Sequence, residues 1–296
     1  MTSVTAIASE RPALARDLLE LTKPRITTLN LIATAGGFGL AHSHASALTF
    51  LATLVGTGLV VGAANALNCV LERDVDRLMA RTRDRPLPAG RLSAQVALFF
   101  GLGLAALGVP LLTLVVNPLA GLLATIALVG YVLVYTPLKR KSPAALLVGA
   151  VPGAVPPLLG WAAATGRIEL PGLVLFGVLF LWQVPHFIAI TLYRLDDYAR
   201  AGFKVLPLEQ GLPAARRTLV LYLAATVAAS LTLVPVGAAG SIYLVCAAIL
   251  GAAVLWGAFK GLRPGADAKW ARSFFMSTNF YLMLLMTALM VDRFVR

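Results

Sequence analysis

Long apolar stretches, separated by short polar connections, follow one another from residue 26 almost to the C-terminal end of the chain. A helix needs about 20 mostly apolar residues to cross a bilayer. The pattern predicts nine such helices, the first of them short, at 26–41, 47–70, 93–115, 118–135, 144–163, 170–193, 217–236, 240–260 and 273–291. The fold class it predicts is all-α, a polytopic membrane bundle of nine transmembrane helices.

Two proline-containing segments predict departures from straight helices. Asn117-Pro118 separates two apolar stretches so closely that we expect a tight hairpin there. Pro152, Pro156 and Pro157 lie within 144–163, which we expect to be kinked or partly unwound. Such a break is tolerated where protein or a cavity covers the freed backbone groups.

The composition agrees with a single membrane domain over residues 1–296. Hydrophobic residues make up 59% of the chain and charged residues 13%, and no polar linker divides it. Residues 1–25 mix charges with short apolar runs and lack the apolar core and cleavage site of a secretory signal. We expect residues 11–25 to form an interfacial helix on the cytoplasmic side.

The basic residues predict the orientation of the chain. All of the 25 Lys and Arg residues except Arg167, Arg293 and Arg296 fall in connections on one side of the predicted bundle. Basic connections stay in the cytoplasm, so the N-terminus is expected inside and the C-terminus outside. The same asymmetry explains the net charge of +12 through contact with the lipid bilayer, without a nucleic acid partner.

Two acidic clusters lie at the predicted cytoplasmic ends of apolar stretches, where carboxylates are costly and usually functional. In the first, Asn65, Asn68, Glu72 and Asp76 share one face of a helix, because they recur at three- and four-residue spacing. Amide and carboxylate oxygens in this arrangement suit Mg²⁺, which also binds phosphate oxygens. We therefore expect this face to hold a metal-bridged diphosphate.

The second cluster follows the stretch 170–193. Gln183, His186, Tyr193 and Asp197 form one stripe, and Asp196 adjoins it. If the two helices are neighbours, their stripes enclose a polar pocket at the cytoplasmic surface, with metal ligands drawn from both: Asn68, Glu72, Asp76, Asp196 and Asp197. The alternative is that these are ordinary helix-end acids paired with nearby arginines.

The cationic residues near these clusters are candidate substrate ligands. The run from Arg81 to Arg91, which includes Arg85, could bind a diphosphate or the carboxylates of a second substrate, since guanidinium groups bind both bidentately. Lys204 could contact the diphosphate from the connection after the second cluster. In both cases the alternative is a basic connection that only sets topology.

The histidines and cysteines give weaker signals. His186 lies within a predicted membrane helix, where it could ligate iron, move a proton or simply form a hydrogen bond in the bundle. His42 and His44 fall in an outer connection far from the acids and are not expected to be catalytic. Cys69 and Cys246 sit in apolar surroundings and form no metal or redox motif.

Several motifs together resemble those of the UbiA-type intramembrane prenyltransferases, and among these the heme O synthase (protoheme IX farnesyltransferase) group. They are Leu21-Thr-Lys-Pro-Arg25, Asn68 to Pro86, Tyr135-Thr-Pro-Leu-Lys-Arg140, Gly153-Ala-Val-Pro-Pro157 with Gly160-Trp161, Trp182-Gln-Val-Pro-His-Phe187, and Asp196 to Gly202 with Leu206-Pro207. The resemblance covers nearly the whole chain. The acidic clusters are typical of the superfamily, and the blocks around His186 and Asp197 of the narrower group. Glu72 stands where the family usually has Asp.

The resemblance implies a reaction and its cofactor. Farnesyl diphosphate would bind with Mg²⁺ at its headgroup, its allylic bond would ionise, and a vinyl group of heme B would capture the farnesyl cation before water adds. The residues that it implicates in catalysis are Asn68, Glu72, Asp76, Tyr193 and Asp197. The basic residues that it implicates in substrate binding are Arg73, Arg77, Arg81, Arg85, Lys139, Arg140 and Lys204. It further implies a bacterial cytoplasmic (inner) membrane, an active site facing the cytoplasm, and a heme A synthase as a plausible partner.

Two other functions stay open on the sequence. A sister prenyltransferase would use the same metal pocket with an aromatic acid, a quinone precursor, a chlorophyllide or a glycerol ether as acceptor. A secondary transporter would use the acids as an ion path, although transporters place coupling residues near the bilayer midplane and these acids cluster at one rim.

Overall fold

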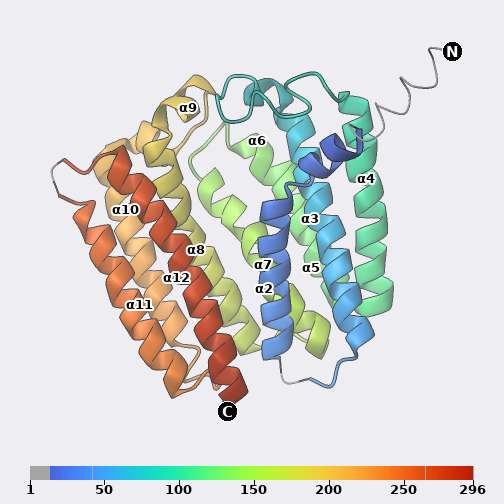
Figure 1. Cartoon of the computed structure of the whole chain (residues 1–296), viewed down its shortest axis with the longest axis vertical. Coiled ribbons are helices and arrows are strands. Elements are labelled where there is room, and N and C mark those ends of the chain that lie inside the picture. Colours follow the sequence, from blue (N-terminus) through green and yellow to red (C-terminus); the bar gives the residue numbers. More distant parts are fainter. Residues whose placement is uncertain (1–13, 42, 264, 296) are drawn as a thin grey trace.

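A bilayer offers the backbone no hydrogen-bonding partners, so a chain that crosses it repeatedly forms helices or a closed barrel. This chain forms helices. The computed structural model describes residues 14–41, 43–263 and 265–295, and these residues contain no strand (Figure 1). After a helix over residues 14–21, the elements are α2 (Pro24–Leu40), α3 (Ala47–Asp76), α4 (Ala94–Pro110), η1 (Leu111–Val116), α5 (Pro118–Val129), η2 (Gly130–Tyr135), α6 (Thr136–Leu138), α7 (Ala145–Thr165), α8 (Leu170–Tyr193), α9 (Leu195–Arg200), α10 (Leu206–Leu231), α11 (Ser241–Lys260) and α12 (Ala268–Val295).

The predicted membrane helices are present, with some shifted ends. Among the described residues, eight helical segments are long and apolar enough to cross a membrane, and the 17-residue α2 is the short first helix. α3 continues to Asp76, six residues beyond its predicted end, and so carries the first acidic cluster as helix. α10 begins at Leu206, well before the predicted residue 217, and Gly211 with φ 84° interrupts it.

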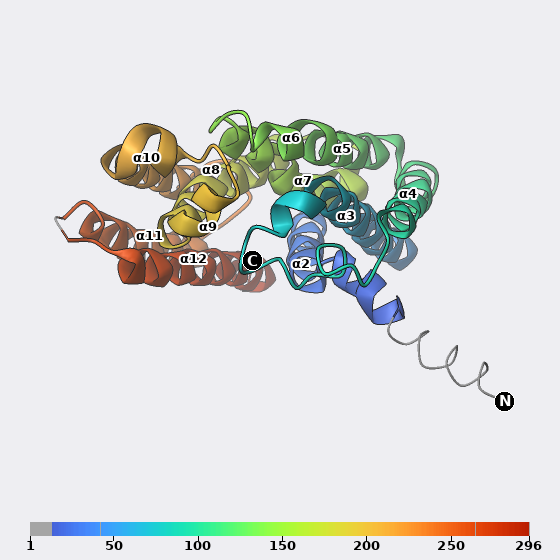
Figure 2. The ribbon, with the colours of Figure 1, turned by 90° about the horizontal axis from the view of Figure 1, so that it is seen from above.

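α7 is continuous, so the predicted unwinding of this segment is wrong. Pro152, Pro156 and Pro157 all lie inside the helix and all are buried. Fourteen of the 21 residues of α7 are buried, and it packs against α2, α5 and α8. Seen along the helix axes, α7 lies in the interior of the bundle (Figure 2). Surrounding protein therefore supports the helix where the prolines remove hydrogen bonds.

Glycines let α2 and α7 pack backbone to backbone. A Cβ placed on Gly160 of α7 would lie 2.8 Å from the backbone nitrogen of Phe38 and would also meet the Thr34 carbonyl. A Cβ on Gly37 of α2 would overlap the Pro157 carbonyl. Small residues at such crossings are typical of membrane helices, because close approach of the backbones provides most of the packing energy.

Two helices widen into π-helical turns. α4 passes into η1 at Pro110, and α5 passes into η2, which ends just before Pro137. In the second case the Thr136 hydroxyl donates to the carbonyl of Tyr131, five residues earlier, at 2.8 Å. Asn117 separates the two helices as the predicted hairpin: its Oδ1 accepts from the backbone of Ala120 at 2.8 Å. π-turns of this kind often mark functional sites.

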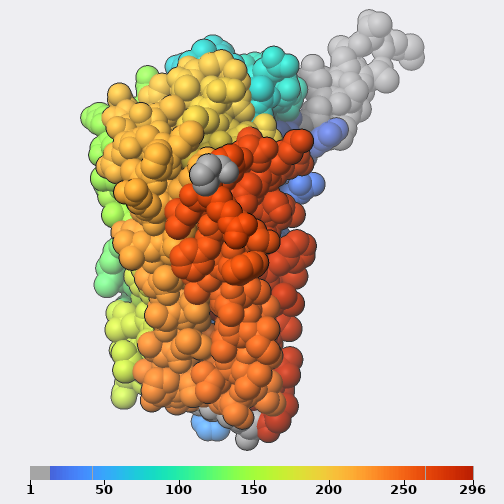
Figure 3. Space-filling model, turned by 90° about the vertical axis from the view of Figure 1, so that its left-hand side faces the viewer, coloured from blue at the N-terminus to red at the C-terminus, as the bar shows by residue number. Residues whose placement is uncertain are grey.

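The C-terminal helices form a second half of the bundle. α10, α11 and α12 cover one face of the molecule from end to end (Figure 3). Asp292 near the end of α12 caps the start of α11, where its carboxylate accepts from the backbone of Gly240 at 2.6 Å and of Tyr243 at 3.1 Å. Buried Tyr243 donates to the Ser230 carbonyl of α10 at 3.0 Å, which joins the three helices.

The connections that carry most of the charge lie at one end of the bundle. Helix 14–21, the segment 77–93, residues 139–144 and α9 meet there, whereas α12 ends at the opposite end (Figure 1). Asp17 of the first helix pairs with Arg91 at 3.1 Å, which ties the N-terminal segment to the connection after α3. The predicted helix over residues 11–25 is therefore confirmed only in part. It covers residues 14–21, residues 22 and 23 are not helical, and Pro24 begins α2. Residues 11–13 lie outside the described residues.

Candidate active site

One face of α3 carries buried polar side chains at the charged end of the bundle. Asn65, Asn68, Glu72 and Asp76 are each less than a tenth exposed. The Nδ2 of Asn68 donates to Glu72 Oε2 at 2.9 Å and to Thr136 Oγ1 at 3.1 Å. The helical spacing predicted from the sequence therefore places these side chains on one face of α3, and Thr136 reaches Asn68 from the π-turn of η2. We call these side chains, together with those that bond to them, the array.

Lys23 reaches this array from the start of α2. Its Nζ donates to Asn68 Oδ1 at 2.9 Å, while Asn65 donates to the neighbouring Thr22 carbonyl at 3.1 Å. Lys23 has φ 49°, and it is the one described non-glycine residue with a positive φ. Strained backbone is often retained at functional sites. Here it directs a cation onto the polar face of α3.

Lys139 approaches the same face from the end of α6. Its ammonium forms an ion pair with Glu72 and lies 4.8 Å from the centre of the Tyr135 ring and 5.6 Å from that of Phe203. The Lys139 carbonyl also accepts from the backbone of Lys204 at 3.0 Å. Lys139 thus links α3, η2 and the segment after α9.

Arg85 completes the cationic side of the site. Its Nη1 lies 2.9 Å from Asp76 Oδ2, with 25% of the Arg85 side chain and 5% of the Asp76 side chain exposed. Thr82 donates to the Asp76 carbonyl at 2.8 Å, and this bond closes the turn after α3 over the carboxylate. Removing either partner would leave a buried charge unpaired.

The charges of this array do not cancel. Glu72 and Asp76 supply two carboxylates, whereas Lys23, Arg85 and Lys139 supply three cations. Burial lowers the pKa of Lys23 below its usual range, and the nearby positive charges of Arg85 and Lys139 act in the same direction. Burial acts against the Lys139 ammonium too, but Tyr135 and the Glu72 carboxylate raise its pKa above the ordinary value. An anion bound beside these three basic groups would favour the charged form of Lys23 and would therefore be stabilised here.

The second acidic cluster lies on α9, beside the end of α3. Asp197 is buried and pairs with Arg200 and, at 3.7 Å, with Arg194, whereas Asp196 is exposed. Val75 and Met79 pack against Ala201 and Phe203 in a small apolar cluster that Tyr198 covers. This contact brings the two acidic segments together at one end of the bundle, as the sequence predicted.

The predicted route of that contact is wrong. Among the described helices α3 and α8 share no extended interface, because α7 packs between them. Gln183 consequently donates to the Ala150 carbonyl of α7 at 3.0 Å and does not face α3. Tyr193 ends α8, with its ring 5.7 Å from that of Phe275 and beside Arg194. The contact between the two acidic segments is formed by residues at and beyond the helix ends, not by the two stripes.

The remaining predicted cations lie further out. Arg73 and Arg77 pair with exposed Asp74, at 3.2 and 3.8 Å. Lys204 pairs with Glu209 at 3.1 Å. Arg81 and Arg140 are exposed. Arg77 also donates to the Pro88 carbonyl at 3.2 Å. These side chains thus lie at the surface of the molecule, and three of them are already paired.

His186 lies deeper, on α8. Its Nδ1 is 3.1 Å from Thr278 Oγ1 of α12, and its ring lies between those of Trp182 and Phe275. It contacts none of the carboxylates described above. His44 lies in the connection at the opposite end, and His42 lies outside the described residues.

The donor set suits a divalent cation in kind, because Asn68, Glu72 and Asp76 present amide and carboxylate oxygens side by side. No three His, Cys, Asp or Glu side chains of the described part of the chain lie close enough together to hold a metal ion. Each buried carboxylate of the two acidic clusters instead faces a lysine or an arginine, as the helix-end alternative predicted. A divalent cation would take over oxygens that these cations now neutralise.

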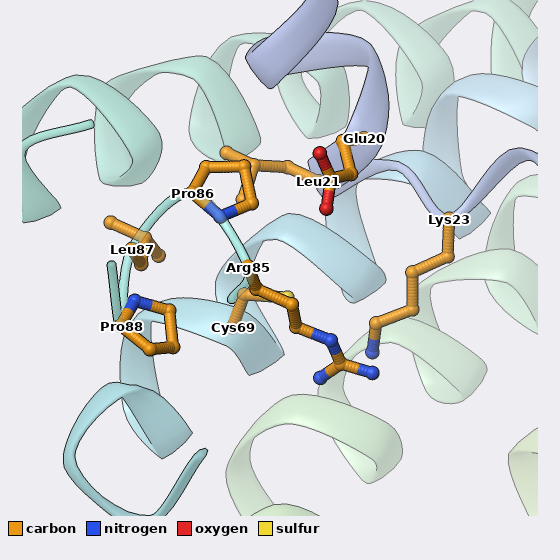
Figure 4. A pocket seen from close by; sticks show the side chains of 8 residues that line it. All are labelled: Glu20, Leu21, Lys23, Cys69, Arg85, Pro86, Leu87 and Pro88. Atoms are coloured by element: carbon orange, nitrogen blue, oxygen red, sulfur yellow. The ribbon is translucent and has the colours of Figure 1, made fainter. Parts of the chain in front are cut away.

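A small cavity of about 30 Å³ lies beside the array, between Lys23, Cys69 and Arg85 (Figure 4). In Figure 4 the Lys23 ammonium and the Arg85 guanidinium reach toward the same side of this cavity. Its volume is enough for about one water molecule. Binding a substrate therefore requires the ion pairs of the array to separate. A larger hollow of about 490 Å³, lined by Trp161, Arg167 and Glu169, contains none of the acids of α3 or α9.

Two members of the array, Lys23 and Thr136, were not predicted as site residues from the sequence. Both lie within motifs that signalled the family, Leu21 to Arg25 and Tyr135 to Arg140. Their contacts with Asn68 span 45 and 68 positions of the chain. A spacing rule for one helix does not detect such contacts.

Comparison with known sequences shows which family the chain is similar to. The model of the UbiA prenyltransferase family matches residues 30–281. A protoheme IX farnesyltransferase of Anaeromyxobacter sp. (strain Fw109-5) is 50% identical over 293 residues, which are 98% of each chain. One of Sorangium cellulosum (strain So ce56) is 55% identical over 80% of this chain and 85% of its own, and one of Myxococcus xanthus (strain DK1622) is 47% identical over 99% and 100%.

Solved structures share the fold. A structure of a digeranylgeranylglyceryl phosphate synthase has a TM-score of 0.80 at 19% identity, and the match covers 94% of this chain and 98% of that one. A UbiA homolog from Archaeoglobus fulgidus bound to DMAPP and Mg²⁺ has a TM-score of 0.70 at 20% identity, with 93% and 99% covered. By its sequence and its fold, the chain belongs to the UbiA prenyltransferase family.

Proposed function

We propose that this protein transfers the farnesyl group of farnesyl diphosphate to a vinyl group of heme B, with addition of water, to give heme O and diphosphate. The observation that carries the proposal is the identity of 47–50% with protoheme IX farnesyltransferases over almost the whole chain. The cation-rich polar array at the end of α3 supplies the anion-binding chemistry that a prenyl diphosphate needs.

The diphosphate site is proposed at this array. Lys23, Arg85 and Lys139 would turn from the amide and carboxylates of α3 to the diphosphate oxygens, and Arg81 and Lys204 would join them from the surface. We propose that Arg73, Arg77 and Arg140 pair with the carboxylates of heme B, the second substrate. Charged donors fixed before the reaction stabilise the charge that develops on a leaving group.

We propose that the reaction depends on Mg²⁺, held by Asn68, Glu72, Asp76, Asp196 and Asp197. The ion, when bound, neutralises the departing diphosphate and so favours ionisation. Two structures of a UbiA homolog from Archaeoglobus fulgidus are bound to Mg²⁺ together with DMAPP or GPP. The oxygen-rich face of α3 supports the same use of the ion here.

The bond changes balance without an oxidant or reductant. The C1–O bond of farnesyl diphosphate breaks, and its electron pair leaves with the diphosphate. The vinyl π pair of heme B then bonds to C1, and the new cation beside the macrocycle takes the oxygen of water and releases a proton. The chain's own task is to hold both substrates together while apolar helices keep water from the first cation.

The membrane placement follows the same proposal. The basic connections at the site end favour the cytoplasm, so we propose that the N-terminus lies inside, the C-terminus outside, and the site at the cytoplasmic face of a bacterial inner membrane. The product heme O could pass to a heme A synthase; that partnership stays a prediction.

A product assay tests the function. Purified protein in liposomes receives farnesyl diphosphate and Mg²⁺ with heme B, or with an aromatic acid or quinone precursor, and products are identified by mass spectrometry. A hydroxyethylfarnesyl heme formed only with Mg²⁺ is the expected result. Prenylation of another acceptor with heme B untouched would overturn the choice of acceptor, and product formed in excess EDTA would overturn the metal dependence.

A further inference from the structure

His186 occupies a well-defined position within the bundle. Its ring centre lies 4.5 Å from that of Trp182 and 4.6 Å from that of Phe275. Tyr193, the last residue of α8, lies seven positions after it, so His186 lies about 10 Å along the helix from the polar end. Its contacts are aromatic rings and the hydroxyl of Thr278.

The Thr278 hydroxyl determines which nitrogen of His186 carries the proton. Thr278 Oγ1 lies 2.7 Å from the carbonyl oxygen of Phe275. A carbonyl only accepts, and a hydroxyl has a single proton, so that proton is directed to Phe275. The 3.1 Å contact between Thr278 Oγ1 and His186 Nδ1 therefore requires an N–H on Nδ1. In the neutral imidazole the lone pair is then on Nε2.

Thr278 also holds the ring that covers His186. Its carbonyl accepts from the indole nitrogen of Trp182 at 2.9 Å. Thr278 itself is fully buried on α12. One residue thus fixes both the tautomer of His186 and the position of its stacking partner.

The second nitrogen of His186 is available. Nε2 has no hydrogen-bond partner among the described residues, and it is absent from the buried polar atoms without partners. The residue is partly exposed. An imidazole with its Nδ1–H engaged and its Nε2 lone pair open is the arrangement that metal-ligating histidines adopt. The rings of Trp182 and Phe275 lie against the imidazole and hold its orientation.

We propose that Nε2 of His186 ligates the iron of the heme substrate, and that Thr278 is the positioning residue that keeps this nitrogen as the donor. The inference rests on heme B being the acceptor, as proposed above. A dative N–Fe bond forms without change in oxidation state. Holding the iron there fixes the depth of the macrocycle, so that a vinyl group is presented toward the diphosphate end.

The test uses binding alone, without farnesyl diphosphate. Full-length protein in nanodiscs is titrated with heme B, and the reduced complex is examined by optical and resonance Raman spectroscopy for the iron–histidine stretch. Wild type should show this band. His186→Ala should lose it and regain an imidazole-bound spectrum when free imidazole is added.

Thr278 is tested with a matched control on the same helix. Thr278→Val removes the acceptor at constant shape and should weaken heme binding about 10–100-fold, the usual effect of losing the hydrogen bond behind a ligating histidine. Thr278→Ser should restore it. Thr287, which donates to the Met283 carbonyl at 2.9 Å on the exposed side of α12, provides the control Thr287→Val, which should bind heme like wild type.

Three results would overturn the assignment. A histidine-bound spectrum that survives in His186→Ala and disappears in His44→Ala would show that His44, at the opposite end of the bundle, is the iron ligand. Equal heme affinity of Thr278→Val and Thr287→Val would remove the positioning role. Heme O production by His186→Ala at the wild-type KM for heme would refute the ligand while leaving the proposed function intact, whereas folded wild type that neither binds nor converts heme would refute both.

Discussion

Lys139 carries the strongest single-residue prediction at the site, because it faces Glu72 in a largely buried ion pair. Lys139→Gln leaves the Glu72 carboxylate without its cation and removes a proposed diphosphate contact. We expect the free energy of unfolding to fall by about 1–3 kcal/mol, after allowance for the partial exposure of Lys139. We also expect the KM for farnesyl diphosphate to rise at least about tenfold.

The nearby Lys141 provides the control, since it is exposed on the same segment and has no assigned role in substrate binding. Lys141→Gln removes one positive charge from the same end of the molecule but breaks no described ion pair. Steady-state kinetics and thermal unfolding in the same detergent compare the two variants. Equal effects would mean that only the total charge at this end matters, and the ion pair would lose its assigned role.

Asp197 and Asp196 differ in surroundings although they are adjacent. Asp197 is buried and paired with two arginines, and Asp196 is exposed. Asp197→Asn should reduce kcat about 100-fold or more, whereas Asp196→Asn should have the smaller effect even if it contributes a metal oxygen. Similar losses in both variants, measured at saturating substrate and Mg²⁺, would contradict the order that burial predicts.

At the scale of elements, the contact of α2 with α7 positions Lys23 and the start of α2 against α3. Gly160→Ala would force a Cβ to 2.8 Å from the Phe38 backbone. Because the backbone of a packed helix cannot shift without disturbing its neighbours, we expect the free energy of unfolding to fall by about 1–3 kcal/mol. Gly39, where an added Cβ meets nothing within 4 Å, is the control.

Thermal unfolding of the two variants measures this contact. Gly39→Ala should leave the melting temperature unchanged or raise it, because alanine favours helix. A Gly160→Ala protein that melts like Gly39→Ala would show that α2 and α7 can separate without cost, and the close packing would then not hold Lys23 in place.

The elements also show what the sequence could and could not predict. Hydropathy placed the helices because each must cover its backbone with apolar side chains, and the four-residue spacing of Asn68, Glu72 and Asp76 placed them on one face. The order of helices in space was out of reach of these rules. Gln183 shares a stripe with Asp197, but α7 intervenes and takes its hydrogen bond. The π-turn that brings Thr136 to Asn68 leaves no periodic signal either.

For the whole molecule, the basic connections predict which end of the bundle faces the cytoplasm and which faces outward. In a background with Cys69 and Cys246 replaced by alanine, Arg140→Cys and Arg167→Cys place single thiols at opposite ends of the bundle. An impermeant maleimide applied to intact cells should label the thiol at position 167, and the thiol at 140 only after permeabilisation. The reverse labelling pattern would contradict the predicted orientation and would place the site at the outer face of the membrane.

We propose that the array on α3 ionises farnesyl diphosphate and that the farnesyl group is transferred to heme B. One experiment measures both the release of diphosphate and the farnesylation of heme. Diphosphate release and hydroxyethylfarnesyl heme are quantified in the same reaction with Mg²⁺, for wild type and for Asp76→Asn. We predict equal amounts of the two products in wild type and a parallel loss of about 100-fold or more in the variant, with the protein still folded in the membrane. Diphosphate released without farnesylated heme, or near-normal turnover by Asp76→Asn, would contradict it.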